Sequence, residues 1–336
     1  MRRFFHIPLS FSKPSTNFYM TELPELYRLD KRLMRRAFES AAREYDKSAM
    51  LQHEVGRRML ERLDLVRLKP SFILDAGAGT GAPTKALAQR YNGATVIALD
   101  IAHGMLLEAR TRVSFLSKWF THRQTFICGD IESLPLTAAS VDIIFSNLSL
   151  QWCNDLDRAL SEFCRVLKPG GLLMFSTFGP DTLRELRASW GKVDQYSHVN
   201  AFMDMHDIGD ALVRARFANP VMDVERYTLT YPDLNTLMRD LKNIGAHNVM
   251  AGRPHGLTGK GRLHRLIAAY EAYRKDGALP ASYEVVYGHA WAPETAVRQK
   301  TQDGVVKIPL ASLRGRSRHP ASRDISSSLY VRRKVA

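Results

Sequence analysis

Four short apolar runs in the first half of the chain each lead to an acidic or polar residue. Each run has the length of a buried strand, and stretches with helical spacing separate them. Alternating strands and helices predict an α/β fold with a mostly parallel sheet. Because the carboxyl ends of parallel strands share one edge, the polar residues should lie together there. The runs lie in residues 72–75, 94–100, 125–130 and 141–147, and they lead to Asp75, Asp100, Asp130 and Asn147.

Further patterns extend this prediction along the chain. Apolar residues at helical spacing predict a helical layer over residues 29–66, ahead of the first strand. An amphipathic helix over 155–167 closes at Lys168-Pro-Gly-Gly171, which is typical of a helix end. We also predict strands at 172–178, 220–229, 283–291 and 305–310, and helices at 181–190, 207–217, 234–244 and 262–275.

The first strand is followed by alternating glycines and a helix-forming stretch, residues 83–91. Gly77, Gly79 and Gly81 allow a sharp turn and a close approach of backbone to ligand. The unpaired N–H groups of the helix start would face that ligand. The spacing also fits a relaxed dinucleotide fingerprint. However, Asp75 would repel a pyrophosphate and attract the cationic end of S-adenosylmethionine (SAM). A turn without a ligand remains an alternative.

The next two strand ends supply candidate contacts to an adenosine. Asp100 lies 25 residues after Asp75, a position from which an acid accepts hydrogen bonds from ribose hydroxyls. Asp130 and the backbone of Ile131 are placed to meet the adenine edge. Met105 either lies against the adenine or packs in the core. These residues, the three glycines, Asp75 and Asn147 are the predicted cofactor-binding set.

The net charge of +14 is unevenly distributed. Residues 231–336 hold 18 Lys and Arg against 8 Asp and Glu, which leaves +10 in the last third. This asymmetry indicates either an acidic partner or a solvated basic surface with a disordered tail. The three cysteines lack metal-ligand spacing and indicate a reducing compartment, no disulfide framework and no metal site. No apolar run approaches the length of a bilayer span.

Several of these segments together resemble the class I SAM-dependent methyltransferases. The resemblance covers about residues 70–178 and includes Asp75 to Gly81, Asp100, Gly129-Asp130 and the terminator 165–171. It implies a Rossmann-like fold with a seven-stranded, mostly parallel sheet and helices on both faces. An N-terminal helical lid and a C-terminal helical insertion would complete the fold.

A narrower resemblance covers nearly the whole chain. Residues 38–55, 146–152, 178–186, 237–248 and 251–259 resemble the malonyl-[acyl-carrier protein] O-methyltransferases of biotin synthesis, the BioC family. That family implies methyl transfer from SAM to the free carboxylate of a malonyl group on acyl carrier protein. Mitochondrial complex I assembly factors, some of them thought to hydroxylate an arginine, share part of the pattern. A SAM-fold assembly protein without enzymatic activity, or a methyltransferase for another acceptor such as nucleic acid, is a further alternative.

The resemblance implies roles for further residues. Tyr45 and Trp152 would wall the cleft near the methyl or malonyl group and position the reactants, with no general base required, although core packing is the simpler interpretation of Tyr45. We expect a monomeric cytoplasmic enzyme that binds acyl carrier protein, with no nucleic acid, metal or membrane insertion. The expected carboxylate-steering and carrier-docking residues are Arg43, Arg184, Arg239, Lys242, Arg253, Lys260, Arg262 and Arg265.

The sequence also predicts a domain order. We expect a disordered leader (1–28), a helical lid (29–70), a SAM-binding core (71–230), an extension for docking (231–313) and a basic, disordered tail (314–336).

Overall fold

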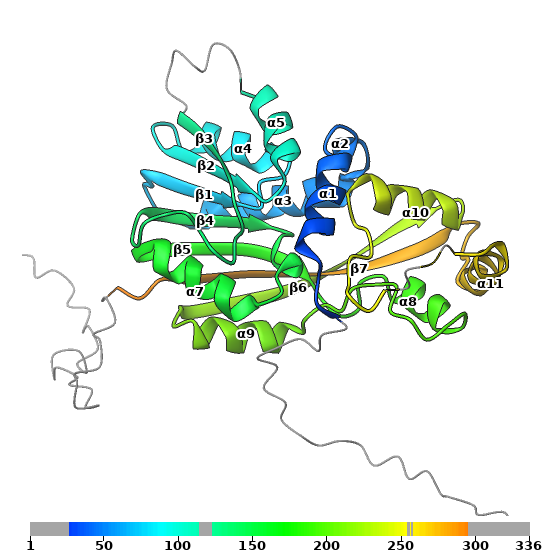
Figure 1. The fold of residues 1–336 in the computed structure, drawn as a ribbon. Coiled ribbons are helices and arrows are strands. Elements are labelled where there is room, and N and C mark those ends of the chain that lie inside the picture. Colours follow the sequence, from blue (N-terminus) through cyan, green and yellow to red (C-terminus); the bar gives the residue numbers. More distant parts are fainter. Residues whose placement is uncertain (1–26, 114–122, 254–255, 257, 295–336) are drawn as a thin grey trace, which may run out of the picture. The chain divides into compact units, whose positions relative to one another are not determined.

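The protein is described by a computed structural model, which covers residues 27–113, 123–253, 256 and 258–294. Within these residues seven strands form one sheet in the order β3-β2-β1-β4-β5-β7-β6 (Figure 1). The first five of these strands are parallel, whereas β7 runs antiparallel to both neighbours. The predicted seven-stranded, mostly parallel sheet is confirmed. The strands are β1 (Phe72–Ala76), β2 (Thr95–Asp100), β3 (Arg123–Cys128), β4 (Val141–Asn147), β5 (Leu167–Phe178), β6 (Ala218–Tyr231) and β7 (Leu279–Trp291).

Helices cover both faces of the sheet. Alternate residues of β1 point to opposite faces, so Ile73 packs with α3 and α4 while Leu74 packs with α7 and α9. Both faces are therefore apolar, which explains why the central strands are continuous apolar runs. The helices are α1 (Lys31–Ala41), α2 (Tyr45–Ser48), α3 (Met50–Arg62), α4 (Ala82–Arg90), α5 (His103–Thr111), α7 (Leu156–Val166), α8 (Arg184–Gly191), α9 (Met205–Arg214), α10 (Leu234–Asn243) and α11 (Lys260–Glu271), with short 3₁₀ turns at Leu63–Leu65 and Leu150–Trp152.

Acidic caps fix where several helices begin. The Asp30 carboxylate accepts hydrogen bonds from the backbone N–H groups of Arg32 and Leu33 at the start of α1. Asp155 caps α7 and Asp233 caps α10 in the same way. Such caps satisfy N–H groups that have no partner within the helix.

The N-terminal helices cross the carboxyl edge of the parallel strands. Helix α1 passes in front of this edge and packs against α5 (Figure 1). Ala41, the last residue of α1, and Ala42, its C-cap, lie against Ala102 and Met105. The predicted helical layer over 29–66 is thus confirmed as α1 to α3, and its first part lies where the polar strand ends meet.

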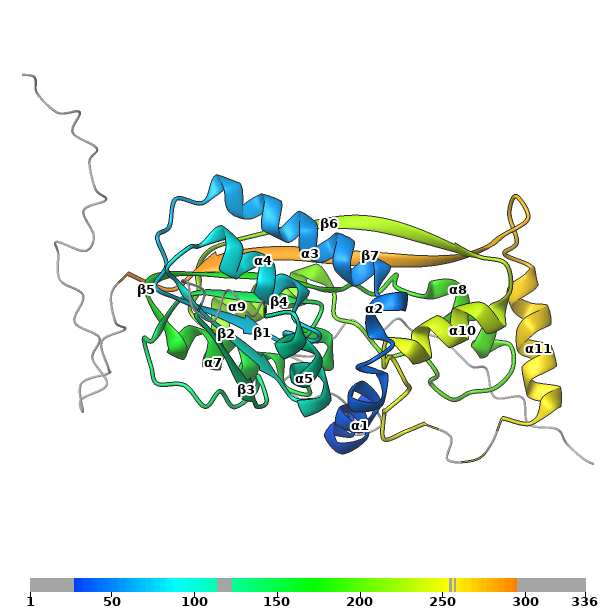
Figure 2. The ribbon, with the colours of Figure 1, turned by 90° about the horizontal axis from the view of Figure 1, so that it is seen from above.

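Strands β6 and β7 continue beyond the parallel part of the sheet. Strand β5 pairs with β7 only from Val285 to Trp291, while Leu279 to Glu284 pair with β6 alone. The resulting two-stranded ribbon carries α10 and α11 at its end, together with α8 (Figure 2). Since β7 is a strand of the main sheet, the core continues past residue 230 and the helical segment is an insertion within it.

Four sequence predictions concern the end of α7 and the two ends of the chain. Helix α7 ends at Val166, as its predicted stop implies, yet Lys168 to Gly171 already belong to β5. The leader (1–28) is described only from residue 27, and the strand at 305–310 and the tail (314–336) lie outside the described residues. No helix of the described part is long and apolar enough to cross a membrane.

Candidate functional site

The turn after β1 is built from three glycines with positive φ angles. Gly77, Gly79 and Gly81 have φ of +80°, +54° and +79°. A Cβ on Gly77 would lie 2.4 Å from the Cβ of Ser149, and one on Gly81 would lie 2.7 Å from the Cβ of Ala109. Both positions therefore require glycine for conformation and for space.

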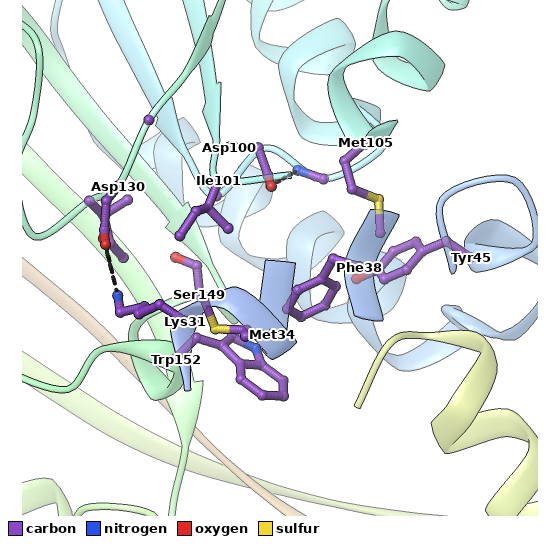
Figure 3. Close-up of a pocket in the computed structure, with 14 residues that line it drawn as sticks. Lys31, Met34, Phe38, Tyr45, Asp100, Ile101, Met105, Asp130, Ser149 and Trp152 are labelled. Atoms are coloured by element: carbon purple, nitrogen blue, oxygen red, sulfur yellow. Dashed lines mark hydrogen bonds and ion pairs between the residues drawn. The ribbon is translucent and has the colours of Figure 1, made fainter. Parts of the chain in front are cut away.

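This turn forms the floor of a cavity at the carboxyl edge of the sheet (Figure 3). Its empty volume is about 570 Å³, part of it open to solvent. The walls come from β-strand ends, α5 and the N-terminal helices. Eight of the predicted site residues line it: Tyr45, Gly77, Gly79, Asp100, Met105, Asp130, Ile131 and Trp152.

Asp100, the last residue of β2, lines this cavity. One carboxylate oxygen accepts a hydrogen bond from the Gly79 N–H at 2.9 Å, and the other accepts one from the Ala102 N–H at 2.8 Å. Burial raises the pKa of Asp100 to about 6, although its backbone hydrogen bonds work in the opposite direction. A carboxylate has about four acceptor sites, so each oxygen keeps capacity for a further donor, such as a ribose hydroxyl.

The remaining three predicted cofactor residues do not line the cavity. Asp75 is fully buried and accepts a hydrogen bond from the Thr84 hydroxyl at 2.5 Å. Its second oxygen has no partner among the described residues, and burial raises its pKa to about 7. Asp75 is therefore buried at the end of β1, next to the glycine turn, and does not line the cavity. Gly81 shapes the start of α4.

Asn147 has a structural partner on each side of its amide. Its Nδ2 donates to the Gln52 carbonyl at 2.9 Å, and its Oδ1 accepts from the Ser176 hydroxyl at 2.9 Å. These contacts tie α3 and β5 to the end of β4. Both ends of the Asn147 amide thus bond the protein itself, and Asn147 does not line the cavity.

The N-terminal segment contributes one wall of the cavity. Phe38 of α1 meets Trp152 edge to face, with ring centroids 5.1 Å apart. Asp46 of α2 accepts a hydrogen bond from the Thr80 hydroxyl at 2.8 Å and pairs with Arg112, which ties α2 to the glycine turn and to α5. Tyr45, the first residue of α2, lines the cavity beside this contact. Its burial, and then the charges of Asp100 and Asp46, raise its pKa well above the usual range.

Lys31 is a cavity residue that the sequence analysis did not identify. Its ammonium lies 3.1 Å from the Asp130 carboxylate and 3.0 Å from that of Glu132. Burial opposes the charge of Lys31, but the negative groups around it outweigh this cost and raise its pKa. Lys31 thus holds α1 against the segment after β3. No local pattern links residues that are 99 positions apart, so no sequence signal could have identified this pair. Met34, Phe38, Ile101 and Ser149 also line the cavity without having been predicted to do so.

The expected docking cations divide into two groups. Arg184, Arg253 and Arg262 already bind the protein, through Glu185, the Met250 carbonyl and Asp194. The others are exposed and have no ion pair with a described residue: Arg43, Arg239, Lys242, Lys260 and Arg265. Residues 231–294 contain eight Lys and Arg against six Asp and Glu, a net +2, so most of the predicted basic excess lies outside the described residues.

The groups that line the cavity indicate the kind of ligand that fits it. No group of three His, Cys, Asp or Glu in the described segments is placed to hold a metal ion. The cavity instead combines a glycine floor, a carboxylate with spare acceptor capacity and aromatic walls. Such a set fits a nucleoside-containing ligand with a flexible, charged end.

Comparisons with known proteins agree with this geometry. The family described as "Methyltransferase domain" matches residues 74–175. The crystal structure of the YcgJ protein from Bacillus subtilis superposes with a TM-score of 0.50 at 15% identity, covering 71% of this chain and all of that one. A candidate methyltransferase from Bacillus halodurans gives a TM-score of 0.50 at 20% identity and covers 70% of this chain and 98% of its own. At these identities the two structures show a shared fold alone. The fold and the site together define a class I methyltransferase domain.

Closer relatives identify the family. The malonyl-[acyl-carrier protein] O-methyltransferase of Methylovorus sp. (strain MP688) is 56% identical over 274 residues, which cover 81% of this chain and 93% of the relative. The enzyme of the same name from Gallionella capsiferriformans (strain ES-2) is 56% identical over 272 residues, covering 81% and 94%. This chain belongs to the malonyl-[acyl-carrier protein] O-methyltransferase family, as its sequence resemblance predicts.

Proposed function

We propose that this protein transfers a methyl group from SAM to the free carboxylate of a malonyl group on acyl carrier protein. The product is a malonyl methyl ester, which starts the pimeloyl chain of biotin. The observation that carries this proposal is the cavity at the strand ends, with its glycine floor and Asp100, in a chain of this family. Because the two relatives named above are methyltransferases, we place this reaction ahead of arginine hydroxylation and of a non-enzymatic assembly role.

The residues present fit SAM as the co-substrate. The spare acceptor sites of Asp100 suit the ribose hydroxyls, and Ile131 and Met105 offer apolar contacts to an adenine. Gly77 and Gly79 leave room for the methionine part, while the buried Asp75 next to them favours its cationic end. When bound, SAM supplies a methyl group already activated by its sulfonium.

The acceptor side needs positioning more than proton transfer. A malonate carboxylate has a pKa well below 7 and is ionised without the help of a base. The raised pKa of Tyr45 keeps its hydroxyl protonated near neutral pH, so this group can donate a hydrogen bond but does not act as a base there. Tyr45 and Trp152 then contribute by aligning the carboxylate and excluding water. We expect no strongly bound cation on that carboxylate, since its charge is lost in the transition state.

The carrier protein would dock beside α10 and α11. Acyl carrier proteins are acidic, and the exposed cations Arg239, Lys242, Lys260 and Arg265 all belong to these two helices. Both ribbon views place α10 and α11 at the same end of the structure (Figures 1 and 2). Complementary charge of this kind speeds encounter and selects partners. We place the reaction in the cytoplasm and expect a monomeric enzyme.

Methyl transfer from labelled SAM tests the proposal. The malonyl form of the carrier should acquire the label in a base-labile ester, while the holo carrier without malonyl should not. Malonyl-CoA, as a second acceptor, reports how far the carrier protein itself is recognised. If SAM binds but the malonyl carrier remains unlabelled, the proposed acceptor is wrong.

A further inference from the structure

A second cavity adjoins the first one and is lined by none of the predicted cofactor-binding residues. Its empty volume is about 1330 Å³, and its walls come from α8, α10 and the segment 198–202. Trp152 lines both cavities, so this cavity begins where the SAM cavity ends. Most of its lining is apolar, including Leu186, Phe202 and Met238.

A group that accepts a methyl must approach in line with the bond that breaks. The nucleophile therefore comes from a direction that SAM itself does not occupy. Trp152 lies between the two cavities at the side of the SAM site that faces α10. Because it shares Trp152 with the SAM cavity, the second cavity is the adjoining space on this side of the site.

A third cavity, whose empty volume of about 1060 Å³ includes space open to solvent, is a poorer route. It shares no described lining residue with the SAM cavity, and Asp204 and Asp207 contribute to its lining. These carboxylates would repel a substrate that carries a free carboxylate. The lining of the second cavity includes no Asp or Glu within the described part of the chain, and the exposed Lys242 stands at its rim.

We propose that the second cavity binds the pantetheine arm of an acyl thioester and leads its acyl end past Trp152 to the methyl group. This inference rests on the function proposed above and adds a binding site to it. The apolar walls suit the methyl and methylene groups of such an arm. The half-buried Asn200 lines the cavity, and its carboxamide makes no hydrogen bond to a described residue. It is therefore available to one of the two amides of the arm. Lys242 at the rim faces the end that carries the phosphate.

Met238 gives a direct test because its side chain lines the cavity and is 38% exposed. Met238→Trp should fill part of the route without disturbing the buried core. Val213→Trp is the matched control, since Val213 is 61% exposed on α9 and lines none of the three cavities. Circular dichroism and SAM affinity measured by calorimetry verify the fold and the first cavity of each variant.

The probe is malonyl-pantetheine, whose binding is measured by calorimetry in the presence of S-adenosylhomocysteine. We expect Met238→Trp to weaken this binding by about tenfold to a hundredfold, because the indole takes up space that the arm needs, and Val213→Trp to leave it unchanged. Lys242→Glu should weaken malonyl-phosphopantetheine more than malonyl-pantetheine, because only the former carries the phosphate.

Two results would overturn the inference: no binding of malonyl-pantetheine to the wild-type protein, or equal binding by Met238→Trp. Neither depends on turnover. The methyl-transfer assay with the malonyl carrier separately reports whether the proposed reaction itself occurs, so the two proposals can fail independently.

Discussion

Gly77→Ala tests whether the glycine turn is fixed by sterics. Gly77 has a φ of +80°, and a Cβ added to it would lie 2.4 Å from the Cβ of Ser149. Ser149 cannot easily retreat, because its hydroxyl donates to the Ala76 carbonyl at 3.0 Å and bonds the Ser146 hydroxyl at 2.5 Å. The substitution should therefore displace the turn or Ser149.

The matched control is Gly93→Ala. Gly93 also has a positive φ, +97°, but a Cβ there would meet nothing within 4 Å. The left-handed conformation alone costs about 1–2 kcal/mol for a residue with a side chain. Overfilling a packed site adds about 1–3 kcal/mol, and only Gly77→Ala should incur this addition.

Urea unfolding and SAM calorimetry measure the two effects. Gly77→Ala should lower the free energy of unfolding by more than Gly93→Ala does and should weaken SAM at least about tenfold, because the turn forms the cavity floor. Ser149→Gly added to Gly77→Ala should recover the free energy lost to the steric overlap but not the free energy lost to the left-handed backbone. A double-mutant cycle measures the two contributions. Equal destabilisation by the two alanine variants, with SAM affinity unchanged in both, would refute this reasoning.

Four further predictions follow from the site. Asp75→Asn should reduce the change of the unfolding free energy with pH. Burial raises the pKa of Asp75 to about 7 in the folded state. Its contribution to stability is therefore full below the lower pKa of the unfolded chain and is lost as the pH rises through about 7. Unfolding free energies between pH 5 and 8 measure this, and parallel curves for variant and wild type would contradict it. Asp100→Asn should weaken SAM about tenfold to a hundredfold in calorimetry, since hydrogen bonds to a charged group contribute roughly 1.5–3 kcal/mol; an unchanged affinity would remove Asp100 from the site. Tyr45→Phe should lower kcat for the malonyl carrier while SAM affinity is retained, and a full rate would exclude the hydroxyl from the mechanism. The double variant Arg239→Glu, Arg265→Glu should raise KM for the carrier and make that KM less dependent on salt. Lys69→Glu, just before β1 at the other end of the parallel strands, should change neither. If KM is the same at low and high salt and in the double variant, electrostatic docking is excluded.

Much of the fold could be predicted because its signals are local. The apolar run before Asp75 and the glycines after it specify a strand and a turn within a few residues. The repetition of this pattern at Asp100 predicts a shared edge, since parallel strands align their ends. The cavity then brings Asp100 and Asp130 together, as the pattern implies.

The remaining features depend on contacts between distant segments. Lys31 reaches Asp130 only because α1 crosses the strand ends, and nothing in the sequence near either residue records this. Asn147 ends a strand like the other polar residues, yet its amide bonds Gln52 and Ser176. Side-chain direction is decided by tertiary packing, so a strand-end position alone does not establish a contact with ligand.

The most direct test of the central claim is a single turnover of the protein preloaded with labelled SAM and mixed with the malonyl carrier. We predict that the carrier gains one methyl group as a base-labile ester and that Asp100→Asn, at a SAM concentration too low to saturate it, transfers much less. Retention of the label on SAM, despite demonstrated binding of both SAM and the malonyl carrier, would contradict the account.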